Sequence, residues 1–350
     1  MKRIFLSILI IFLIFEILMF PAEAISYAST GLTLWFNNMI PALFPFMVIS
    51  GLIIRLDIAP MIVGFLHPIL YKIFRTNVYC EYAMVMGFLC GYPMGAVIVR
   101  DLLSKGQISD KQADFLLAFC NNIGPVFLCS LVLPIFSPDY HVLLLVGMYG
   151  IPLIYGFVLR YTVYRKAFKI ISNNNQNDIY KSNPTESVYK KVSPAKNIHK
   201  HSQLKVNTNQ TTFAEAFTDS LNKAVSTSLL LGACMIFFNM LRFLPMHFVN
   251  DNLLLQGILS WLLEVNGALF MTKDFYSIGL KMTSLLLVPF LAIGGLSCIC
   301  QTAGILSETD CKLSKYLTHK VVQWFLWLLL TLLWLLIENL RLFYAWSGSV

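Results

Sequence analysis

Long apolar stretches, separated by short polar or charged segments, make up most of the chain. Several approach the roughly 20 residues that an α-helix needs to cross a hydrocarbon core of about 30 Å, among them 4–20, 142–159 and 321–337. Within these runs the apolar positions are continuous, whereas the strands of a membrane β-barrel alternate in polarity. The pattern therefore predicts an all-α integral membrane protein.

The composition supports this prediction. Of the 350 residues, 57% are hydrophobic and only 13% are charged, and the mean hydropathy is +0.69, whereas soluble domains average about a quarter charged residues. The eight cysteines lie mostly inside apolar segments and lack the CxxC spacing of metal sites. They are interpreted as small buried hydrophobes rather than as disulfides or metal ligands.

The first apolar stretch has two interpretations. Lys2 and Arg3 precede it and a small-residue segment, AEA, follows it, as in a secretory signal peptide. The stretch is longer than the usual apolar core of a signal peptide, which favours an uncleaved first helix with its N-terminus in the cytoplasm. Cleavage stays an open alternative.

The net charge of +8 is concentrated in one polar segment. Nine Lys and Arg fall within 165–205, against two acidic residues, among many Asn and Ser. This composition predicts a disordered basic cytoplasmic loop over 165–212, and no nucleic-acid site is expected because no base-stacking aromatics are interleaved with the charges. The loop divides the chain into a membrane repeat with an extra first helix, 1–164, and a second repeat with an extra last helix, 213–350.

The segment CEYAMVMGFLCGYPMGAVIVRDLLSKG predicts a re-entrant helical hairpin. Arg75 precedes it, and Arg100 and Lys105 lie near its end, so the positive-inside rule places both ends on the cytoplasmic side. Pro93 lacks an amide hydrogen and glycine tolerates unusual backbone angles, so the tip is expected at 91–95, with arms long enough to reach the midplane. A single kinked spanning helix is the alternative.

Two predicted spanning helices contain interruptions. The helix over 112–136 is interrupted at 121–125, NNIGP, and the helix over 278–301 is interrupted at Gly294 and Gly295. Each unpaired backbone group in hydrocarbon costs several kcal/mol, so irregular backbone is tolerated only inside protein or beside a wet cavity. Both interruptions therefore predict a cavity, although a kink whose asparagines bond to neighbouring helices is the alternative for the first.

The two halves of the chain match each other as an inverted repeat. YPMGAVI aligns with EVNGALF, which pairs Gly95 with Gly267, and IGPVFLC aligns with IGGLSCI, which pairs Gly124 with Gly294. The second half is thus expected to contain its own hairpin, over 253–271, and the trace of the chain inserts the halves in opposite orientations. Transporters with such repeats bind their substrate near the midplane, where discontinuous helices meet.

Candidate site residues lie at the interruptions and at the hairpin tips. Half-helix amides and the side chains of Asn121 and Asn122 can donate hydrogen bonds to an anion, which a helix N-terminus favours by roughly 0.3 to 1 kcal/mol. Glu264 is either a functional carboxylate, for proton or cation coupling, or the cap of a helix N-terminus. Further polar residues are expected to line the same cavity, namely Asn266, Ser297 and Gln301.

Three segments, GFLCGYPMGA, CNNIGPVF and GGLSCICQ, make the chain resemble the YlbJ family of sporulation integral membrane proteins, also called stage V sporulation protein V. The resemblance extends over about 31–320 and includes LWFNNMIPALFPFMVISGLI. It implies the Gate element that the family shares with concentrative nucleoside transporters. It also implies that the protein carries dipicolinate from the mother cell across the outer forespore membrane during endospore formation.

The same resemblance implies which residues form the transport core. This sequence departs from the family pattern at Ile123, where a serine is usual, and at Val97, where a lysine is common. The second departure removes a cation that would compensate the charge of an anion; Arg100, one turn further, either replaces it or only marks the membrane interface. The residues of the implied core are Gly91, Tyr92, Pro93, Gly95, Asn121, Asn122, Gly124 and Pro125.

These observations favour a secondary-type transporter of a small organic anion, with dipicolinate as the substrate that the resemblance implies. A nucleoside-type solute transporter and a non-transporting sporulation scaffold are the alternatives. An enzyme is not expected, because HExxH, a Walker A sequence and a Ser, His and Asp set are absent.

No cofactor and no metal are expected. The expected partners are the lipid bilayer and a small-molecule anion, and a homo-oligomer stays open. The predicted location is the bacterial cell membrane and, during sporulation, the outer forespore membrane. The predicted substrate-binding and transport-core residues are Gly91, Tyr92, Pro93, Gly95, Asn121, Asn122, Gly124, Pro125, Glu264, Asn266, Gly267, Gly294, Gly295, Ser297 and Gln301.

Overall fold

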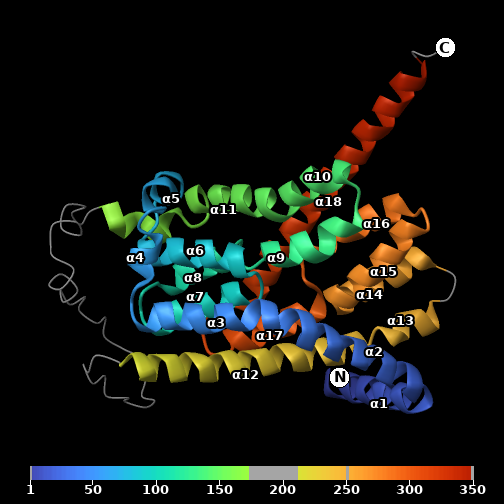
Figure 1. Cartoon of the computed structure of the whole chain (residues 1–350), viewed down its shortest axis with the longest axis horizontal. Coiled ribbons are helices and arrows are strands. Elements are labelled where there is room, and N and C mark those ends of the chain that lie inside the picture. Colours follow the sequence, from blue (N-terminus) through green and yellow to red (C-terminus); the bar gives the residue numbers. More distant parts are fainter. Residues whose placement is uncertain (1, 173–211, 250–251, 348–350) are drawn as a thin grey trace.

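The structure is a computed structural model that describes residues 2–172, 212–249 and 252–347. Every regular element in these residues is helical, as Figure 1 shows, which confirms the predicted all-α class. The predicted disordered basic loop falls mostly outside the described residues. Its first part, Arg165–Ser172, forms a short 3-10 helix.

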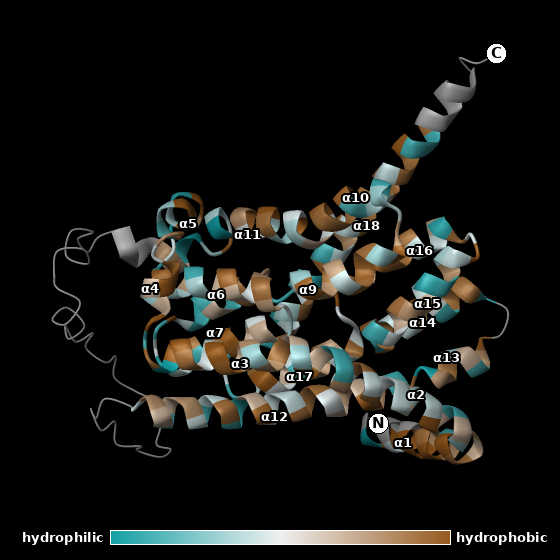
Figure 2. Cartoon of the chain, viewed as in Figure 1, coloured by the Kyte–Doolittle hydropathy of each residue, from teal (hydrophilic) through white to brown (hydrophobic). Residues whose placement is uncertain are grey.

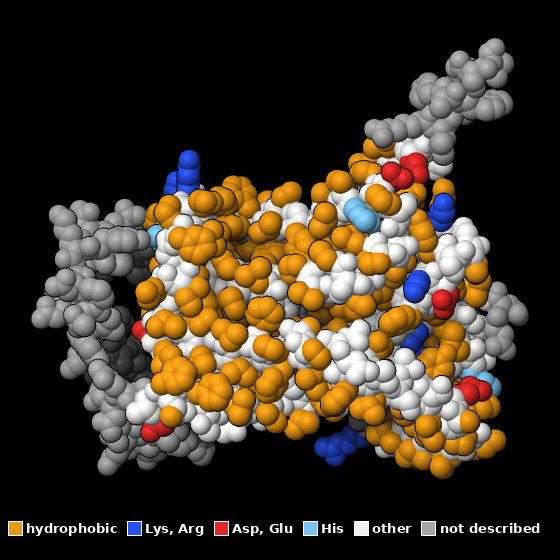
Figure 3. Space-filling model, viewed as in Figure 1, with side chains coloured by type: hydrophobic (Ala, Val, Ile, Leu, Met, Phe, Trp, Pro, Cys, Tyr) orange, Lys and Arg blue, Asp and Glu red, His pale blue; other side chains and the backbone are white. Residues whose placement is uncertain are grey.

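Five helices in the described residues are long and apolar enough to cross a membrane. Many large hydrophobic side chains are exposed along them, as expected of residues that face lipid. Figure 3 shows such side chains over most of one face, with most of the visible charged side chains toward the two ends of the longest axis. The first helix, α1 (Lys2–Met19), is not one of the five. They are Pro21–Arg55, Pro138–Tyr161, Phe213–Phe248, Lys281–Leu306 and Leu313–Leu340.

The first half begins with a long helix that changes its winding in the middle. α2 (Pro21–Leu34) and α3 (Ile40–Arg55) are joined by a π-helical turn, Trp35–Met39, with the sequence WFNNM. Such turns widen a helix and are frequent at functional sites. Two short helices, α4 (Ala59–Val63) and α5 (His67–Phe74), follow.

The predicted re-entrant hairpin is present in place of the kinked spanning helix. α6 (Val78–Cys90) and α7 (Met94–Ser104) pack against each other. α6 begins at Asn77, whose side chain accepts a hydrogen bond from the Cys80 amide at 2.8 Å. It ends at Gly91, whose φ of +81° lies in the left-handed region that favours glycine.

The first predicted interruption is also present. α8 (Asp110–Leu117) is followed by an irregular segment over 118–124 and then by α9 (Pro125–Phe127), which continues through π and 3-10 turns. α10 (His141–Leu145) and α11 (Ile151–Tyr161), joined by a further π turn, cross back.

The second half has the same order of elements. α12 (Phe213–Met240) begins with a capping box in which Thr212 and Glu215 each accept a hydrogen bond from the other's backbone amide. After α13 (Phe243–Phe248), the predicted second hairpin is formed by α14 (Leu253–Leu263) and α15 (Val265–Ser277).

The second interrupted helix follows this hairpin. α16 (Lys281–Leu287) leads into a 3-10 turn, Val288–Ala292, and α17 (Gly295–Leu306) begins after the break at Gly294. The last helix is α18 (Leu313–Ser347).

The two hairpins enter the molecule from opposite ends. In Figure 1 the open end of α6–α7 lies at the left and that of α14–α15 at the right, and both turns point toward the middle. α12 packs along α2 and α3, and α17 packs against α7, so the two halves are interlocked. Hydrophobic residues recur along the whole length of α12 (Figure 2). Opposite entry of the hairpins is what an inverted repeat predicts.

The last helix begins earlier than the sequence indicates. The sequence predicts this helix over 321–344, with Lys315 and Lys320 in the cytoplasmic connection before it. The observed helix starts at Leu313, so both lysines belong to it, and Lys320 is only 1% exposed. The prediction was wrong because clustered lysines lower the local hydropathy as a loop does, whereas here Lys320 is bonded inside the protein.

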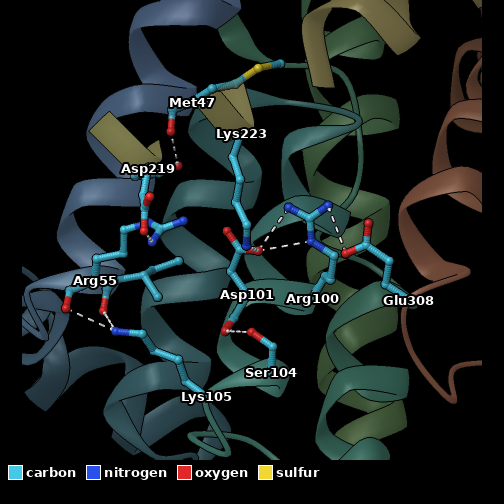
Figure 4. A network of polar contacts seen from close by, with 11 residues as sticks. Met47, Arg55, Arg100, Asp101, Ser104, Lys105, Asp219, Lys223 and Glu308 are labelled. Carbon is cyan, nitrogen blue, oxygen red and sulfur yellow. Dashed lines mark hydrogen bonds and ion pairs between the residues drawn. The ribbon is translucent and has the colours of Figure 1, made fainter. Parts of the chain in front are cut away.

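Ion pairs join the two halves at one end of the molecule (Figure 4). Asp101 Oδ1, near the end of α7, accepts from Arg100 Nε at 3.0 Å and from Lys223 Nζ of α12 at 3.0 Å. Arg100 Nη1 also lies 3.7 Å from Glu308 Oε2, in the connection between α17 and α18. This end network therefore links elements of both halves.

Two further contacts at the same end hold α3. Arg55 Nη1 pairs with Asp219 Oδ2 of α12 at 2.6 Å. Lys105 Nζ donates to the carbonyl oxygens of Ile54 at 2.6 Å and Arg55 at 3.1 Å, and partial burial lowers the pKa of this ammonium group. This is the end that the positive-inside rule predicts on the cytoplasmic side.

Candidate functional site

A cavity of about 350 Å³ lies where both hairpin tips, both interrupted helices and the π turn of the first long helix meet. Such a volume falls within the range of small-molecule sites, about 300 to 1,000 Å³. It is partly open, and hydrophobic side chains form most of its wall. Five predicted site residues from both halves line it, namely Tyr92, Pro93, Gly124, Asn266 and Gln301.

Three polar residues of the wall were missed by the sequence analysis. Asn37 and Asn38 lie in the π turn between α2 and α3, and Ser130 lies in the π turn after α9. The signal for the first two was present in the sequence, because adjacent asparagines in an apolar span also marked the break at 121–125. Ser130 carried no such signal, since single serines are common in membrane helices.

No Lys, Arg, Asp or Glu belongs to the cavity wall among the described residues. The polar groups of the wall are amides and hydroxyls. Pro93, which precedes the first turn of α7, and Cys298, in the first turn of α17, both border the cavity. The first turn of α7 is capped by Asn121 Oδ1, which accepts from the Ala96 amide at 3.4 Å, whereas the N-terminus of α17 has no side-chain cap. Uncapped N-termini carry a partial positive charge and favour anions.

The first hairpin packs closely on the first break. The Tyr92 amide donates to the Asn122 carbonyl oxygen. A side chain at Gly95 would place its Cβ 2.7 Å from the Cys120 carbonyl oxygen and 2.9 Å from Asn121 Cα, so only glycine allows this approach. Gly91 likewise lies against the backbone of Gly124. Gly91 and Gly95 shape the site without lining it.

Asn121 and Asn122 are not part of the cavity wall. They are 0% and 1% exposed, and their side chains bond to neighbouring helices. Asn121 Nδ2 donates to Tyr316 Oη at 3.1 Å and to Thr302 Oγ1 at 3.4 Å. Asn122 Oδ1 accepts from Lys320 Nζ at 2.7 Å, and the Asn121 carbonyl oxygen accepts from the same ammonium group. These asparagines join the first break to α17 and α18.

The second break is built from glycines. Gly294 and Gly295 have φ of +82° and +70°, which favour glycine. A Cβ at Gly295 would lie 2.8 Å from the Trp261 carbonyl oxygen of α14, so this break packs on the second hairpin. Further along α17, Gln301 lines the cavity, and its Nε2 donates to Ser297 Oγ at 3.1 Å. Ser297 itself is fully buried and does not line the cavity.

Glu264 caps the N-terminus of α15. Its Oε2 accepts from the Gly267 amide at 2.7 Å, and its Oε1 accepts from Asn266 Nδ2 at 2.8 Å. The side chain is buried but does not line the cavity. The buried Arg242 lies against Gly267 and interacts electrostatically with Glu264. The geometry matches the capping alternative, which satisfies a free backbone amide.

The other predicted residues lie near the cavity or away from it. Pro125 starts α9 directly behind Gly124 of the wall. Val97 is buried in α7, and Arg100 belongs to the end network, where carboxylates balance its charge. Arg100 therefore does not supply a cation to the cavity.

No group of three or more His, Cys, Asp or Glu side chains that could hold a metal ion occurs among the described residues. All eight cysteines are free thiols. In the described part of the chain, two of them, Cys90 and Cys298, belong to the cavity wall.

Comparison with known proteins identifies a sporulation protein that is similar to this chain over most of its length. The sequence is 23% identical over 333 residues to the sporulation integral membrane protein YlbJ of Bacillus subtilis strain 168, in a match that covers 89% of this chain and 78% of that protein. The chain is a relative of YlbJ. The resemblance to the YlbJ family that the motifs indicated is thus confirmed over most of the sequence.

Similarity to YlbJ also supports a membrane role in sporulation, and the apolar helices agree with multi-pass insertion. No family model matches the sequence, and no solved structure shows significant similarity to it.

Proposed function

We propose that the protein is a secondary-type transporter of a small organic anion, with dipicolinate as the substrate and the outer forespore membrane as its site of action during sporulation. The observation that carries this proposal is the cavity at which both hairpin tips and both interrupted helices meet. This arrangement is typical of transporters built from inverted repeats.

The free-energy cost of interrupting a helix in a membrane supports a transport role over a scaffold role. Irregular backbone in a hydrocarbon environment is tolerated only where it is buried in protein or lines a wet cavity. Here it occurs twice, at 118–124 and at Gly294. Ile123 and Gly124 of the first break line the cavity, and so do Cys298 and Gln301 of the helix that follows the second break. A protein that only recruits partners has no use for such a cavity.

The chemistry of the wall supports an anion or a polar ring as the substrate. Amides of Asn37, Asn38, Asn266 and Gln301 offer hydrogen-bond donors, and the uncapped N-terminus of α17 adds partial positive charge. The apolar part of the wall suits a flat aromatic ring. Dipicolinate, a pyridine ring with two carboxylates, combines these features; its identity as the substrate comes from the family resemblance.

The same wall favours one alternative substrate class. Because no charged side chain lines the cavity in the described residues, a neutral solute with an aromatic ring and several hydrogen-bonding groups, such as a nucleoside, also fits its chemistry. Competition by nucleosides against dipicolinate distinguishes the two.

The test is uptake of labelled dipicolinate by proteoliposomes that contain the purified chain, with and without a pH gradient. We expect saturable uptake that Asn38→Leu and Gln301→Leu, one in each half, each lower at least tenfold. Gln256→Leu is the matched control, because this buried amide of α14 lies outside the cavity wall. Lack of uptake by the folded wild-type protein under every gradient would contradict the proposal and leave the scaffold alternative.

A further inference from the structure

Lys320 is a buried lysine in the last helix that no sequence motif indicated. It is 1% exposed, and its ammonium group donates to the Asn121 carbonyl oxygen and, at 2.7 Å, to Asn122 Oδ1. No carboxylate lies within ion-pair distance of it in the described residues. A buried charge without an opposite charge is costly, so this position calls for an explanation.

The other buried basic groups in the described residues differ from Lys320. Arg100 pairs with Asp101, and Arg242 interacts with Glu264. Arg160 donates to the Arg75 carbonyl oxygen and lies over the Phe168 ring, much as Lys320 Nζ lies over the Tyr316 ring at 5.6 Å, but Arg160 stands at the end of α11 beside the basic segment. Lys320 instead lies within the core of the bundle, beside the break at 118–124.

This cation lies directly behind the cavity wall. Asn122, which it contacts, accepts a hydrogen bond from the amide of Tyr92, and Tyr92 lines the cavity. The residues after Asn122, namely Ile123 and Gly124, also line it. One layer of backbone therefore separates the ammonium group from the space that a substrate would occupy.

Helix capping alone does not require a charge at this position. Gln323, on the same helix and also 1% exposed, donates from Nε2 to the Ala118 carbonyl oxygen at the end of α8. A neutral amide thus performs the same capping one turn further along α18. The charge of Lys320 needs a different role.

We propose that Lys320 is the counter-charge that makes the cavity select anions. It is a positioning residue that acts through the backbone of Asn121 and Asn122 and does not touch the substrate itself. An opposite charge in the cavity would interact with this group more strongly than in water, because the effective dielectric constant inside a protein is about 20 rather than about 80. The inference rests on the proposed function, because it names the group that gives that site its preference for anions.

The test measures the dissociation constant of labelled dipicolinate for the purified full-length protein in detergent. Lys320→Gln keeps a hydrogen-bond donor and removes the charge, and we expect it to weaken binding at least tenfold. Lys320→Arg keeps the charge and should stay within about threefold of wild type. Gln323→Met is the matched control, because it removes a capping hydrogen bond without removing a charge, and it should also stay within about threefold.

A second measurement needs no variant and guards against a Lys320→Gln protein that fails to fold. Wild-type affinity should fall in the order dipicolinate, the monoanion picolinate, and the neutral pyridine-2,6-dicarboxamide. Equal affinity for all three would overturn the inference, as would equal weakening by Lys320→Gln and Gln323→Met.

The outcomes also separate this inference from the proposed function. If wild-type protein binds dipicolinate and Lys320→Gln binds it as tightly, only the role of Lys320 is wrong. If folded wild-type protein neither binds nor transports dipicolinate, the proposed function is wrong and this inference falls with it.

Discussion

The two interrupted helices occupy equivalent places in the two halves, but they are held in different ways. The first break is held by polar side chains: Asn121 and Asn122 bond to Thr302, Tyr316 and Lys320. The second break is held by backbone conformation, with positive φ at two consecutive glycines. In the described residues, no lysine or arginine donates a hydrogen bond to the second break.

Because of this difference, the two breaks are expected to differ in how easily they change conformation. Groups buried with satisfied polar bonds are rigid, because each bond broken leaves an unsatisfied group in a low-dielectric interior. Consecutive glycines restrict the backbone least. In the proposed transport cycle, the first break is therefore expected to be the fixed part of the site, and the second break the part that changes conformation.

The largest effect is expected from breaking the polar attachment of the first break. The double variant Asn121→Leu, Asn122→Leu leaves the ammonium group of Lys320 without its side-chain partner and should lower the free energy of unfolding by about 3 to 5 kcal/mol. Thermal unfolding followed by size-exclusion chromatography should show a midpoint about 10 °C lower. Dipicolinate uptake should be abolished.

Adding Lys320→Met to this double variant tests the physical reason. Removing the stranded charge should recover part of the lost stability, although not the uptake. If the double variant has the same unfolding midpoint and the same uptake as the wild type, the contacts of Asn121 and Asn122 do not stabilise the first break.

A smaller effect is expected at the second break. Gly294→Ala places a Cβ at a φ of +82° and 2.9 Å from Cys298 Cβ, so it should cost about 1 to 2 kcal/mol and lower the unfolding midpoint by a few degrees. Gly304→Ala, in the same helix, is the matched control, because its Cβ would meet only the movable end of Leu230. An equal fall in both variants would argue against a special backbone conformation at Gly294.

The smallest effect concerns a single contact between the halves. Tyr316→Phe removes the acceptor of the 3.1 Å hydrogen bond from Asn121 Nδ2 and should cost about 1 kcal/mol in unfolding free energy. Thr302→Val removes the longer contact of 3.4 Å from the same amide and should cost less. The reverse order, measured by the same unfolding assay, would mean that Thr302 is the main anchor of the first break.

The hairpins and breaks were predictable because the sequence marks them directly. Gly91, Pro93 and Gly294 stand in apolar runs where a continuous helix would not place them, and elementary backbone sterics convert this into turns. The same local signal could not show which polar residues face the cavity. Asn37–Asn38 and Asn121–Asn122 are the same dipeptide in similar apolar surroundings, yet only the first pair lines the cavity.

Lys320 shows the second limit of sequence reasoning. Three lysines within nine residues resemble a loop, because hydropathy is summed along the chain. The hydrogen-bond acceptors of Lys320 instead come from Asn121 and Asn122, about two hundred positions earlier in the chain. Only the tertiary arrangement reveals that this lysine is internal and its neighbour Lys315 is not.

The ion pairs around Asp101 have a consequence for how the molecule responds to its surroundings. Any movement that separates α7 from α12 must pull Lys223 away from Asp101, and both Lys223 and Glu308 are accessible to water. Dissolved ions screen such charges over about 8 Å at physiological ionic strength. In the proposed transport cycle, raising the electrolyte concentration on that face alone should therefore speed its opening and leave the opposite face unaffected, a directional sensitivity that an apolar closure would lack.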